Sequence, residues 1–260
     1  AEAAAYRSDL RAAVTAATHA SGFVPAGPLQ PPPFERMTES RHASYCNYRY
    51  LLEMVSAGVL ETSVVRAIAR YRRSHGGELL GTTRFGGHLD DWPAWHWTRG
   101  LLEADDVAGY LTTFYGHLAH HHSRGNWASY EQVTVLPGPQ GFRTVKGGAE
   151  QVVPSQAMVP LMLKHMLVDD GRDQDVLHLL RACPAAWLAA PGGLGLTDCP
   201  TRWGPISLRA RLRGSEFEVS LRGLERGTPN KIRLRLAIPG LKLTEATLNG
   251  TPVSLTARGT

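Results

Sequence analysis

Apolar residues recur at intervals of three and four positions along most of the chain up to about residue 188. This spacing is typical of α-helices that bury one apolar face. Glycine-containing segments separate several of these helices, as expected at helix ends, where glycine readily takes the left-handed conformation. The helices are expected at 6–17, 45–55, 59–71, 92–102, 107–119, 159–167 and 176–180.

The pattern changes to alternation after the segment Pro191-Gly-Gly193. Alternating apolar and polar residues are typical of strands with one face on the core and the other in water. Asn249-Gly250 is a dipeptide favoured in two-residue hairpin turns. The strands are expected at 206–212, 217–221, 232–238 and 241–248.

These patterns divide the chain into three regions. An N-terminal helix and a proline-rich linker are expected at 1–33, a helical-hairpin domain at 34–190, and a β-domain at 191–260. Helix pairs with functional residues in their connecting loops predict a mainly α-helical toroid or solenoid of hairpins, and the family resemblance described below favours the toroid. The predicted fold is therefore a partial helical-hairpin toroid followed by a small antiparallel β-sandwich.

The composition is that of a globular protein, with 43% hydrophobic and 20% charged residues. No run of about eighteen apolar residues occurs, so no membrane partner is expected. From Thr201 onward the chain has eleven Arg and Lys against four Glu. These basic residues alternate with apolar ones, which predicts the outer face of strands rather than a nucleic-acid site. Three cysteines leave the cellular compartment open, with a secreted or periplasmic location preferred over a cytoplasmic one.

Two segments about thirty residues apart combine tryptophans with carboxylates and histidines. They span 85–97 and 117–132, and they contain four of the six tryptophans. Indole and phenol rings offer apolar faces to sugar rings, while carboxylates and imidazoles can hydrogen-bond to hydroxyls and transfer protons. This combination predicts an oligo- or polysaccharide as the partner of the protein.

Hydrolysis of a glycosidic bond needs one carboxylic acid and one carboxylate on the other side of the bond. Glu131 is the expected acid, because Trp127, Tyr130 and the aliphatic run that follows would remove water and raise its pKa. Asp91 or Asp90 is the expected partner. The other aspartate is expected to cap the helix that begins just after the pair.

Further residues are expected to bind substrate through aromatic faces or hydrogen bonds. His88 follows a Gly-Gly pair in an expected loop, where polar side chains are available to ligands. Trp92 and Trp95 share one helical face and Trp97 is turned away, so one side is expected to line a cleft and the other to pack in the core. The substrate-binding set is His88, Trp92, Trp95, Trp127, Tyr130, Arg41, Tyr45 and Asn47.

The histidine cluster at 117–122 does not predict a metal site. His117 and His121 have a spacing that can place two imidazoles on one helical face. Leu118 nevertheless stands where the zinc-protease motif needs glutamate, and no third ligand lies at a diagnostic distance. We therefore expect no metal and no cofactor, and we assign the histidines to the end of a helix.

Two alternatives to a hydrolase stay open. A polysaccharide lyase can use Tyr45 or His42 to move a proton, beside Arg41 and Asn47. A non-catalytic carbohydrate-binding or assembly subunit can keep the aromatic cleft without productive carboxylates. The hydrolase is preferred because strong carboxylate candidates lie beside aromatic residues, which a lyase does not require.

Six segments carry a resemblance to a known family: 39–47, 86–92, 114–120, 130–132, 179–187 and 200–205. They resemble the late part of the six-hairpin glycosidase superfamily, in which an (α/α)6 toroid precedes a β-sandwich. The resemblance implies a sugar site in the hairpin loops and an inverting mechanism, with carboxyl groups roughly 6.5–9.5 Å apart. The chain holds about half the helices of such a toroid, so an upstream polypeptide or a second chain is expected to complete it.

Overall fold

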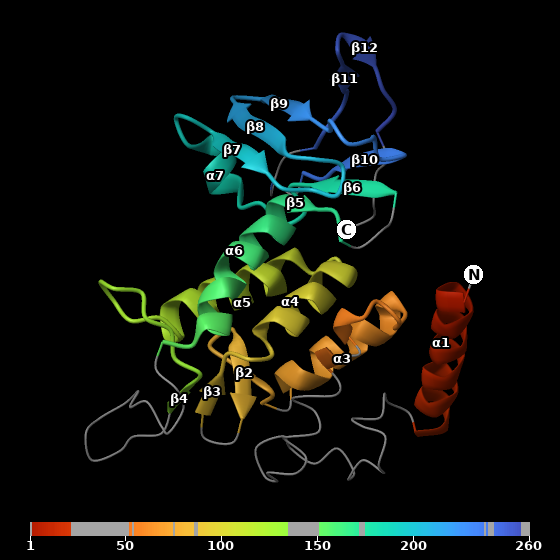
Figure 1. The fold of residues 1–260 in the computed structure, drawn as a ribbon, viewed down its shortest axis with the longest axis vertical. Coiled ribbons are helices and arrows are strands. Elements are labelled where there is room, and N and C mark those ends of the chain that lie inside the picture. Colours follow the sequence, from red (N-terminus) through yellow and green to blue (C-terminus); the bar gives the residue numbers. More distant parts are fainter. Residues whose placement is uncertain are drawn as a thin grey trace.

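The computed structural model describes residues 2–21, 52–53, 55–74, 76–85, 88–134, 151–171, 175–236, 238 and 242–255. The central helices lie between a small sheet at one end of the molecule and the remaining strands at the other (Figure 1). The helices are α1 (Glu2–Ser21), α3 (Thr62–Ser74), α4 (Ala94–Glu103), α5 (Val107–His120), α6 (Val153–Leu167) and α7 (Ala185–Ala189).

The described strands form four small sheets. The first has the order β1-β2-β3-β4 and the second β7-β8-β9, and both are antiparallel. The third has the order β10-β6-β5, with β10 parallel to β6, and β11-β12 is a hairpin. The strands are β1 (Glu78–Leu79), β2 (Thr82–Phe85), β3 (His88–Asp90), β4 (Gln132–Thr134), β5 (Val168–Asp169), β6 (Val176–Leu179), β7 (Leu194–Cys199), β8 (Ile206–Arg213), β9 (Glu216–Gly223), β10 (Lys231–Leu234), β11 (Thr247–Leu248) and β12 (Thr251–Pro252).

The predicted helical-hairpin toroid with a β-sandwich is wrong. The described chain is a mixed α and β fold with six helices and several small sheets. Strands β1, β2 and β3 lie where a toroid would have a hairpin loop, and they form one sheet with β4, which pairs with β3. Residues 176–179 form β6 instead of the predicted helix, because a short apolar run fits either element and strand pairing with β5 and β10 decides between them.

Several element predictions are confirmed. The expected helices at 107–119 and 159–167 are α5 and the C-terminal part of α6, and the expected strands at 206–212 and 217–221 are β8 and β9. Asn249 and Gly250 have φ angles of 51° and 82°, as a tight hairpin turn between β11 and β12 requires. Of the strand expected at 241–248, only 247–248 is extended and paired among the described residues.

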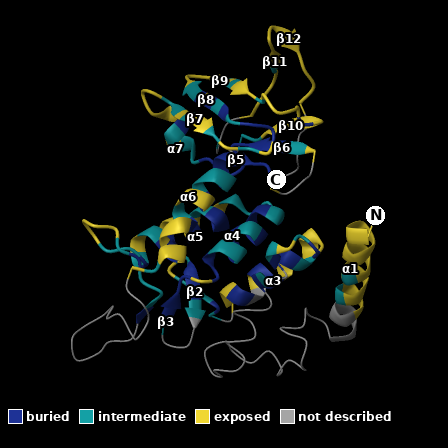
Figure 2. Cartoon of the chain, viewed as in Figure 1, coloured by how far each residue is buried: buried dark blue, intermediate teal, exposed yellow. Residues whose placement is uncertain are grey.

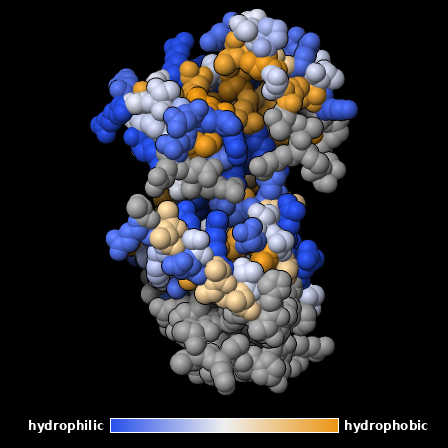
Figure 3. Space-filling view, turned by 90° about the vertical axis from the view of Figure 1, so that its right-hand side faces the viewer, coloured by the Kyte–Doolittle hydropathy of each residue, from blue (hydrophilic) through white to orange (hydrophobic). Residues whose placement is uncertain are grey.

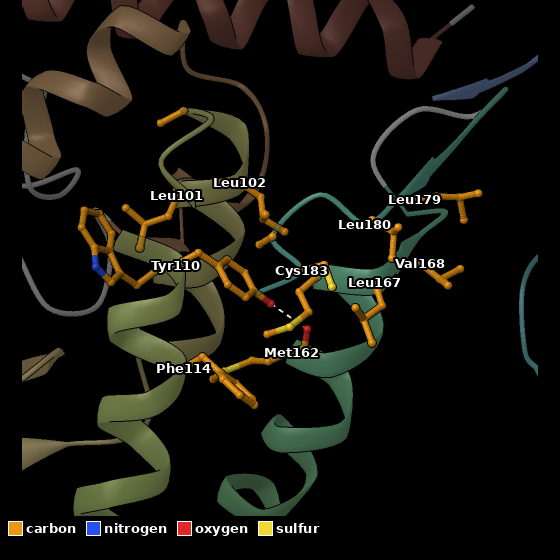
Figure 4. Packing of buried hydrophobic residues seen from close by; sticks show 14 of the residues in the cluster. Leu101, Leu102, Tyr110, Phe114, Met162, Leu167, Val168, Leu179, Leu180 and Cys183 are labelled. Atoms are coloured by element: carbon orange, nitrogen blue, oxygen red, sulfur yellow. Dashed lines mark hydrogen bonds between the residues drawn. The ribbon is translucent and has the colours of Figure 1, made fainter. Parts of the chain in front are cut away.

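The core is continuous from the central helices into the sheets at the C-terminal end. Leu101, Phe114 and Met162 bring α4, α5 and α6 together, and the Tyr110 hydroxyl donates to the carbonyl oxygen of Met162 at 2.7 Å (Figure 4). The burial of each such apolar side chain stabilises the fold by about 1.5–3 kcal/mol. Buried residues concentrate along one side of these helices and in strands β3, β5 and β6, whereas α1 is largely exposed (Figure 2).

A buried ion-pair network joins the helices to the β10-β6-β5 sheet. The Asp169 carboxylate, which is fully buried, accepts from Arg99 at 3.1 Å and from Arg181 at 2.8 Å. Arg181 also donates to the carbonyl oxygen of Leu102. These two guanidinium groups lower the pKa of Asp169 to about 2, against the opposing effect of its burial. The junction therefore depends on charges that compensate one another.

Apolar side chains gather at the C-terminal end of the molecule (Figure 3). Those that are large and exposed there are Ile232, Leu234, Leu243, Leu248, Val253 and Leu255. Among the described residues, every helix is too short or too polar to cross a membrane.

Candidate functional site

The edge of the first sheet brings the two predicted carboxylate segments together. Strands β3 and β4 pair with Asp90 opposite Gln132, and one residue further the Asp91 N–H donates to the carbonyl oxygen of Glu131 at 3.1 Å. The beginning of α6 places Ser155 beside the Asp91 carboxyl. Residues separated by about forty and sixty positions along the chain therefore meet at one site.

Asp91 lies in a buried environment that favours its protonated form. Its side chain is only 2% exposed. Burial raises the pKa of Asp91 to about 7, and the negative charges of Asp90 and Glu131 add to the rise. The Ser155 hydroxyl lies nearby and opposes the rise, although it does not meet the geometry of a hydrogen bond. Asp91 can therefore carry a proton at neutral pH.

Asp90 is bound into the local structure. Its Oδ1 accepts from the Trp92 N–H at 3.1 Å and its Oδ2 accepts from the Gln132 side-chain amide at 2.8 Å. The expected side-chain cap on the following helix is wrong, because α4 begins after Pro93 without a side-chain cap. Asp90 instead stabilises the turn between β3 and α4.

The segment before β4 carries Trp127, Tyr130 and Glu131, whose side chains differ in exposure. Glu131 and Tyr130 are half-buried, whereas Trp127 is 59% exposed. Backbone bonds with His121 hold Tyr130 in place, since its N–H donates to the His121 carbonyl oxygen at 2.8 Å. Trp127 therefore offers its indole to solvent, beside His122.

The histidine cluster packs behind the carboxylates. His117 and His121 are fully buried, and their rings stack with centroids 5.5 Å apart. His117 Nε2 lies 3.2 Å from the Ser155 carbonyl oxygen, and His121 Nδ1 lies 3.0 Å from the Tyr130 carbonyl oxygen, so both nitrogens must donate. Burial lowers the pKa of His117 to about 3 and that of His121 to about 4. Both imidazoles are therefore neutral at physiological pH.

The described residues contain no group of three or more His, Cys, Asp or Glu side chains arranged to hold a metal ion. The His117 Nε2 and His122 Nε2 atoms are 3.3 Å apart. Because His117 Nε2 carries a proton for Ser155, His122 Nε2 must accept, and His122 Nδ1 then donates to the Trp127 carbonyl oxygen at 3.3 Å. The cluster thus ties α5 to the segments that carry Trp127, Tyr130 and Ser155.

An open pocket of about 190 Å³ lies beside the carboxylates, and we call it the tryptophan pocket. Trp92 is 43% exposed and Trp95 is half-buried, whereas Trp97 is buried beneath the Arg72 guanidinium, 4.7 Å from the ring centroid. The turn that carries Trp92 and the helical positions of Trp95 and Trp97 on α4 thus separate pocket from core. The lining residues are Trp92, Trp95, His96, Pro154, Met158 and Leu161.

Other predicted residues lie apart from this arrangement. His88 is part of β3, where it pairs with Thr134, so the expected loop position is wrong. Arg41, His42, Tyr45 and Asn47 lie outside the described residues. Sequence reasoning missed Ser155, Met158 and Leu161, because α6 joins the site only through tertiary packing and has no motif that marks it. It also missed His96 of α4, whose place in the pocket lining depends on the packing of α4 against α6.

Protein families, curated proteins and solved structures contain no match to this chain. The resemblance to the six-hairpin glycosidase superfamily is therefore without support from relatives, and the mixed fold contradicts it. The fold and site define a mixed α and β protein with paired carboxylates beside an aromatic pocket. What that site can do rests on its own geometry.

Proposed function

We propose that this chain hydrolyses glycosidic bonds in an oligo- or polysaccharide, with Asp91 as general acid and Glu131 as the second carboxylate. The observation that carries the proposal is the pairing of a buried carboxyl, whose pKa is raised by burial to about 7, with a half-buried carboxyl group beside the neighbouring strand. Two carboxyl groups in different environments are what acid and base roles require.

The proposal exchanges the roles that the sequence suggested for the two groups. A general acid works best when its pKa lies near the working pH, and burial raises the pKa of Asp91 to about 7. Glu131 is the more accessible of the pair, so it can activate a water molecule or attack the sugar. Asp90 supports both by holding the turn that positions Asp91.

Two exposed tryptophans close along the chain to the carboxyl-bearing residues support a sugar as the substrate. Trp92 adjoins Asp91 in the chain and is 43% exposed, and Trp127 lies four residues before Glu131 and is 59% exposed. Flat indole faces bind the apolar faces of sugar rings, and two such faces near the acid can position adjacent units of a glycan.

The experiment compares Asp91→Asn and Glu131→Gln on aryl glycosides with good and poor leaving groups. An activated leaving group departs without protonation. The hydrolysis rate of Asp91→Asn should therefore fall at least about a hundredfold with the poor leaving group and far less with the activated one. Glu131→Gln should lose activity with both. Asp175→Asn and Glu61→Gln, at exposed positions, are the matched controls.

Three outcomes would overturn the proposal. Unchanged hydrolysis in both carboxylate variants would remove the assigned roles. Glycan binding without turnover by the wild-type chain would indicate a non-catalytic binding protein. A product with ultraviolet absorbance from a new double bond would indicate a lyase.

A further inference from the structure

The tryptophan pocket adjoins the proposed acid through two elements. Trp92, on one wall, is the next residue after Asp91, and Pro154, on the opposite wall, is the residue before Ser155. The first turn of α6 thus supplies both the hydroxyl beside the Asp91 carboxyl and the far side of the pocket. The pocket and the surroundings of the Asp91 carboxyl are thus built by the same two segments, the turn before α4 and the first turn of α6.

The pocket has the size for one ring. Its volume of about 190 Å³ is below the ~300–1,000 Å³ of sites that enclose drug-sized ligands. The Trp95 ring also packs against the His165 ring at a tilt of 36°, with centroids 4.8 Å apart, and this contact occupies part of its surface. Trp92 is the more exposed indole and is the stacking surface that a ligand can reach.

The lining is apolar except for one neutral imidazole. Met158, Leu161 and Pro154 form an aliphatic wall opposite the indoles, and no Arg, Lys, Asp or Glu lines the pocket among the described residues. His96 is also uncharged at neutral pH, because burial lowers its pKa against the opposing charge of Glu53. A carboxylate in this pocket would lose its hydration without gaining a cationic partner.

The contacts of His96 determine what its ring can offer to a ligand. The Ser56 hydroxyl donates its proton to the Glu53 carbonyl oxygen at 2.8 Å. Ser56 Oγ must therefore accept from His96 Nδ1, which lies 2.8 Å away. Because the proton is on Nδ1, Nε2 carries a lone pair, so it can accept a hydrogen bond and cannot donate one.

We propose that the tryptophan pocket is a subsite for a single uncharged sugar ring, which stacks on Trp92 and donates a hydroxyl to His96 Nε2. The inference rests on the proposed function and names its substrate class as neutral glycans, to the exclusion of uronic acids. A uronate carboxylate would meet the His96 lone pair and the aliphatic wall, both of which disfavour it.

Binding of methyl glycosides of neutral hexoses and of the corresponding methyl uronosides, measured by ligand-observed NMR and tryptophan fluorescence, tests the inference. The wild-type chain should bind a neutral glycoside and bind its uronate counterpart at least about tenfold more weakly. Trp92→Ala should weaken neutral-sugar binding about tenfold by removing the stacking face. Tyr115→Ala, which removes an equally exposed aromatic of α5, should leave it unchanged.

Two further variants separate the polar from the apolar contribution. His96→Phe should weaken binding about three- to tenfold, and His96→Gln, which keeps an acceptor, should recover part of the loss. Leu161→Arg adds a cation at a 42% exposed position of the wall and should shift the preference towards the uronoside. Thermal unfolding of each variant shows whether a loss reflects the pocket or the fold.

The outcomes distinguish this inference from the proposed function. Hydrolysis that needs Asp91 and is indifferent to Trp92→Ala and His96→Phe would overturn the subsite and leave the hydrolase intact. Neutral-sugar binding that needs Trp92, without any turnover, would overturn the hydrolase and leave the subsite. Equal or tighter binding of uronosides, or no binding of any neutral glycoside, would overturn the neutral-sugar inference.

Discussion

The backbone N–H of Asp91 donates a hydrogen bond to the carbonyl oxygen of Glu131 at 3.1 Å. This bond continues the pairing of β3 and β4 by one residue, so the relative position of the two carboxyl-bearing residues is set by the sheet rather than by a loop. Backbone pairing of this kind holds side chains more firmly than a flexible connection does. The pair is thus positioned for chemistry that needs a constant separation.

Asp91 should make the protein less stable as the pH rises from about 4 to about 7. Its pKa is 3.8 without burial and about 7 in the folded chain, so the folded state holds a proton that the unfolded state has lost. The contribution of the Asp91 carboxyl to the free energy of unfolding is therefore fully present below pH 4. It falls by at most about 1.4 kcal/mol per pH unit as the pH rises through this window. Urea unfolding of the wild type and Asp91→Asn at several pH values measures the difference.

The variant should gain stability relative to the wild type as the pH rises, and the gain should level off above pH 7. Asp175→Asn, at an exposed position, should follow the wild type. A constant difference between the wild type and Asp91→Asn from pH 4 to pH 8 would show that the pKa of Asp91 is not raised.

Asp90 should contribute to stability through Gln132. Asp90→Ala leaves the Gln132 amide and the Trp92 N–H without their acceptor in a site where Asp90 is only 2% exposed, at a cost of about 1–3 kcal/mol. A double-mutant cycle with Gln132→Ala should give a coupling free energy of about 0.5–3 kcal/mol. Additive effects of the two substitutions would show that the hydrogen bond contributes nothing.

His121 should make the fold sensitive to acid. Its pKa falls from 6.5 to about 4 on burial, so the unfolded chain binds the proton more strongly and stability is lost as the pH falls below 6.5. His121→Asn keeps a donor for the Tyr130 carbonyl oxygen at the place of Nδ1 and cannot titrate. Between pH 6.5 and pH 4.5 the wild type should lose up to about 1.4 kcal/mol per pH unit more than this variant.

His121→Gln, whose donor lies further from the backbone, serves as the comparison. It should be less stable than His121→Asn at every pH because it leaves the Tyr130 carbonyl oxygen unpaired. Parallel loss of stability in the wild type and His121→Asn on acidification would contradict a depressed pKa of His121.

Asp169→Asn should be the most destabilising of these substitutions. It leaves Arg99 and Arg181 as buried charges without their shared partner, which costs about 3–5 kcal/mol. In the wild type, the Asp169 carboxylate stabilises the fold fully above its unfolded pKa of 3.8. This stabilisation is lost as the pH falls towards its folded pKa of about 2. Chemical denaturation at pH 7 measures the cost.

Glu218→Gln is the matched test of an exposed ion pair. Glu218 accepts from Arg211 Nε at 2.8 Å, and its side chain is 64% exposed, so its loss should change stability by at most about 1 kcal/mol. Equal effects of Glu218→Gln and Asp169→Asn would show that the buried network does not bind the two parts of the molecule together.

Patterns that depend on neighbours in the chain could be predicted from the sequence. The helical spacing around Tyr110 and the alternation around Leu208 predict α5 and β8, because each element buries one face and the period follows from its backbone geometry. The tight turn at Asn249-Gly250 follows from the positive φ angles that these two residues tolerate. Asp91 and Glu131 could be selected as candidates because their residue types suit acid and base chemistry.

Only the tertiary structure decided how those parts combine. Strands β1–β4 and β6 are too short for their period to be recognised from the sequence. Pairing decides that they form, and in two cases, β3 with β4 and β6 with β10, it joins segments that lie far apart along the chain. The environment of Asp91 depends on burial under α6, which brings Ser155 and the pocket wall from more than sixty residues away. The sequence by itself thus determined the local elements and the chemical groups, whereas packing decided the burial that raises the pKa of Asp91 and what lies beside its carboxyl.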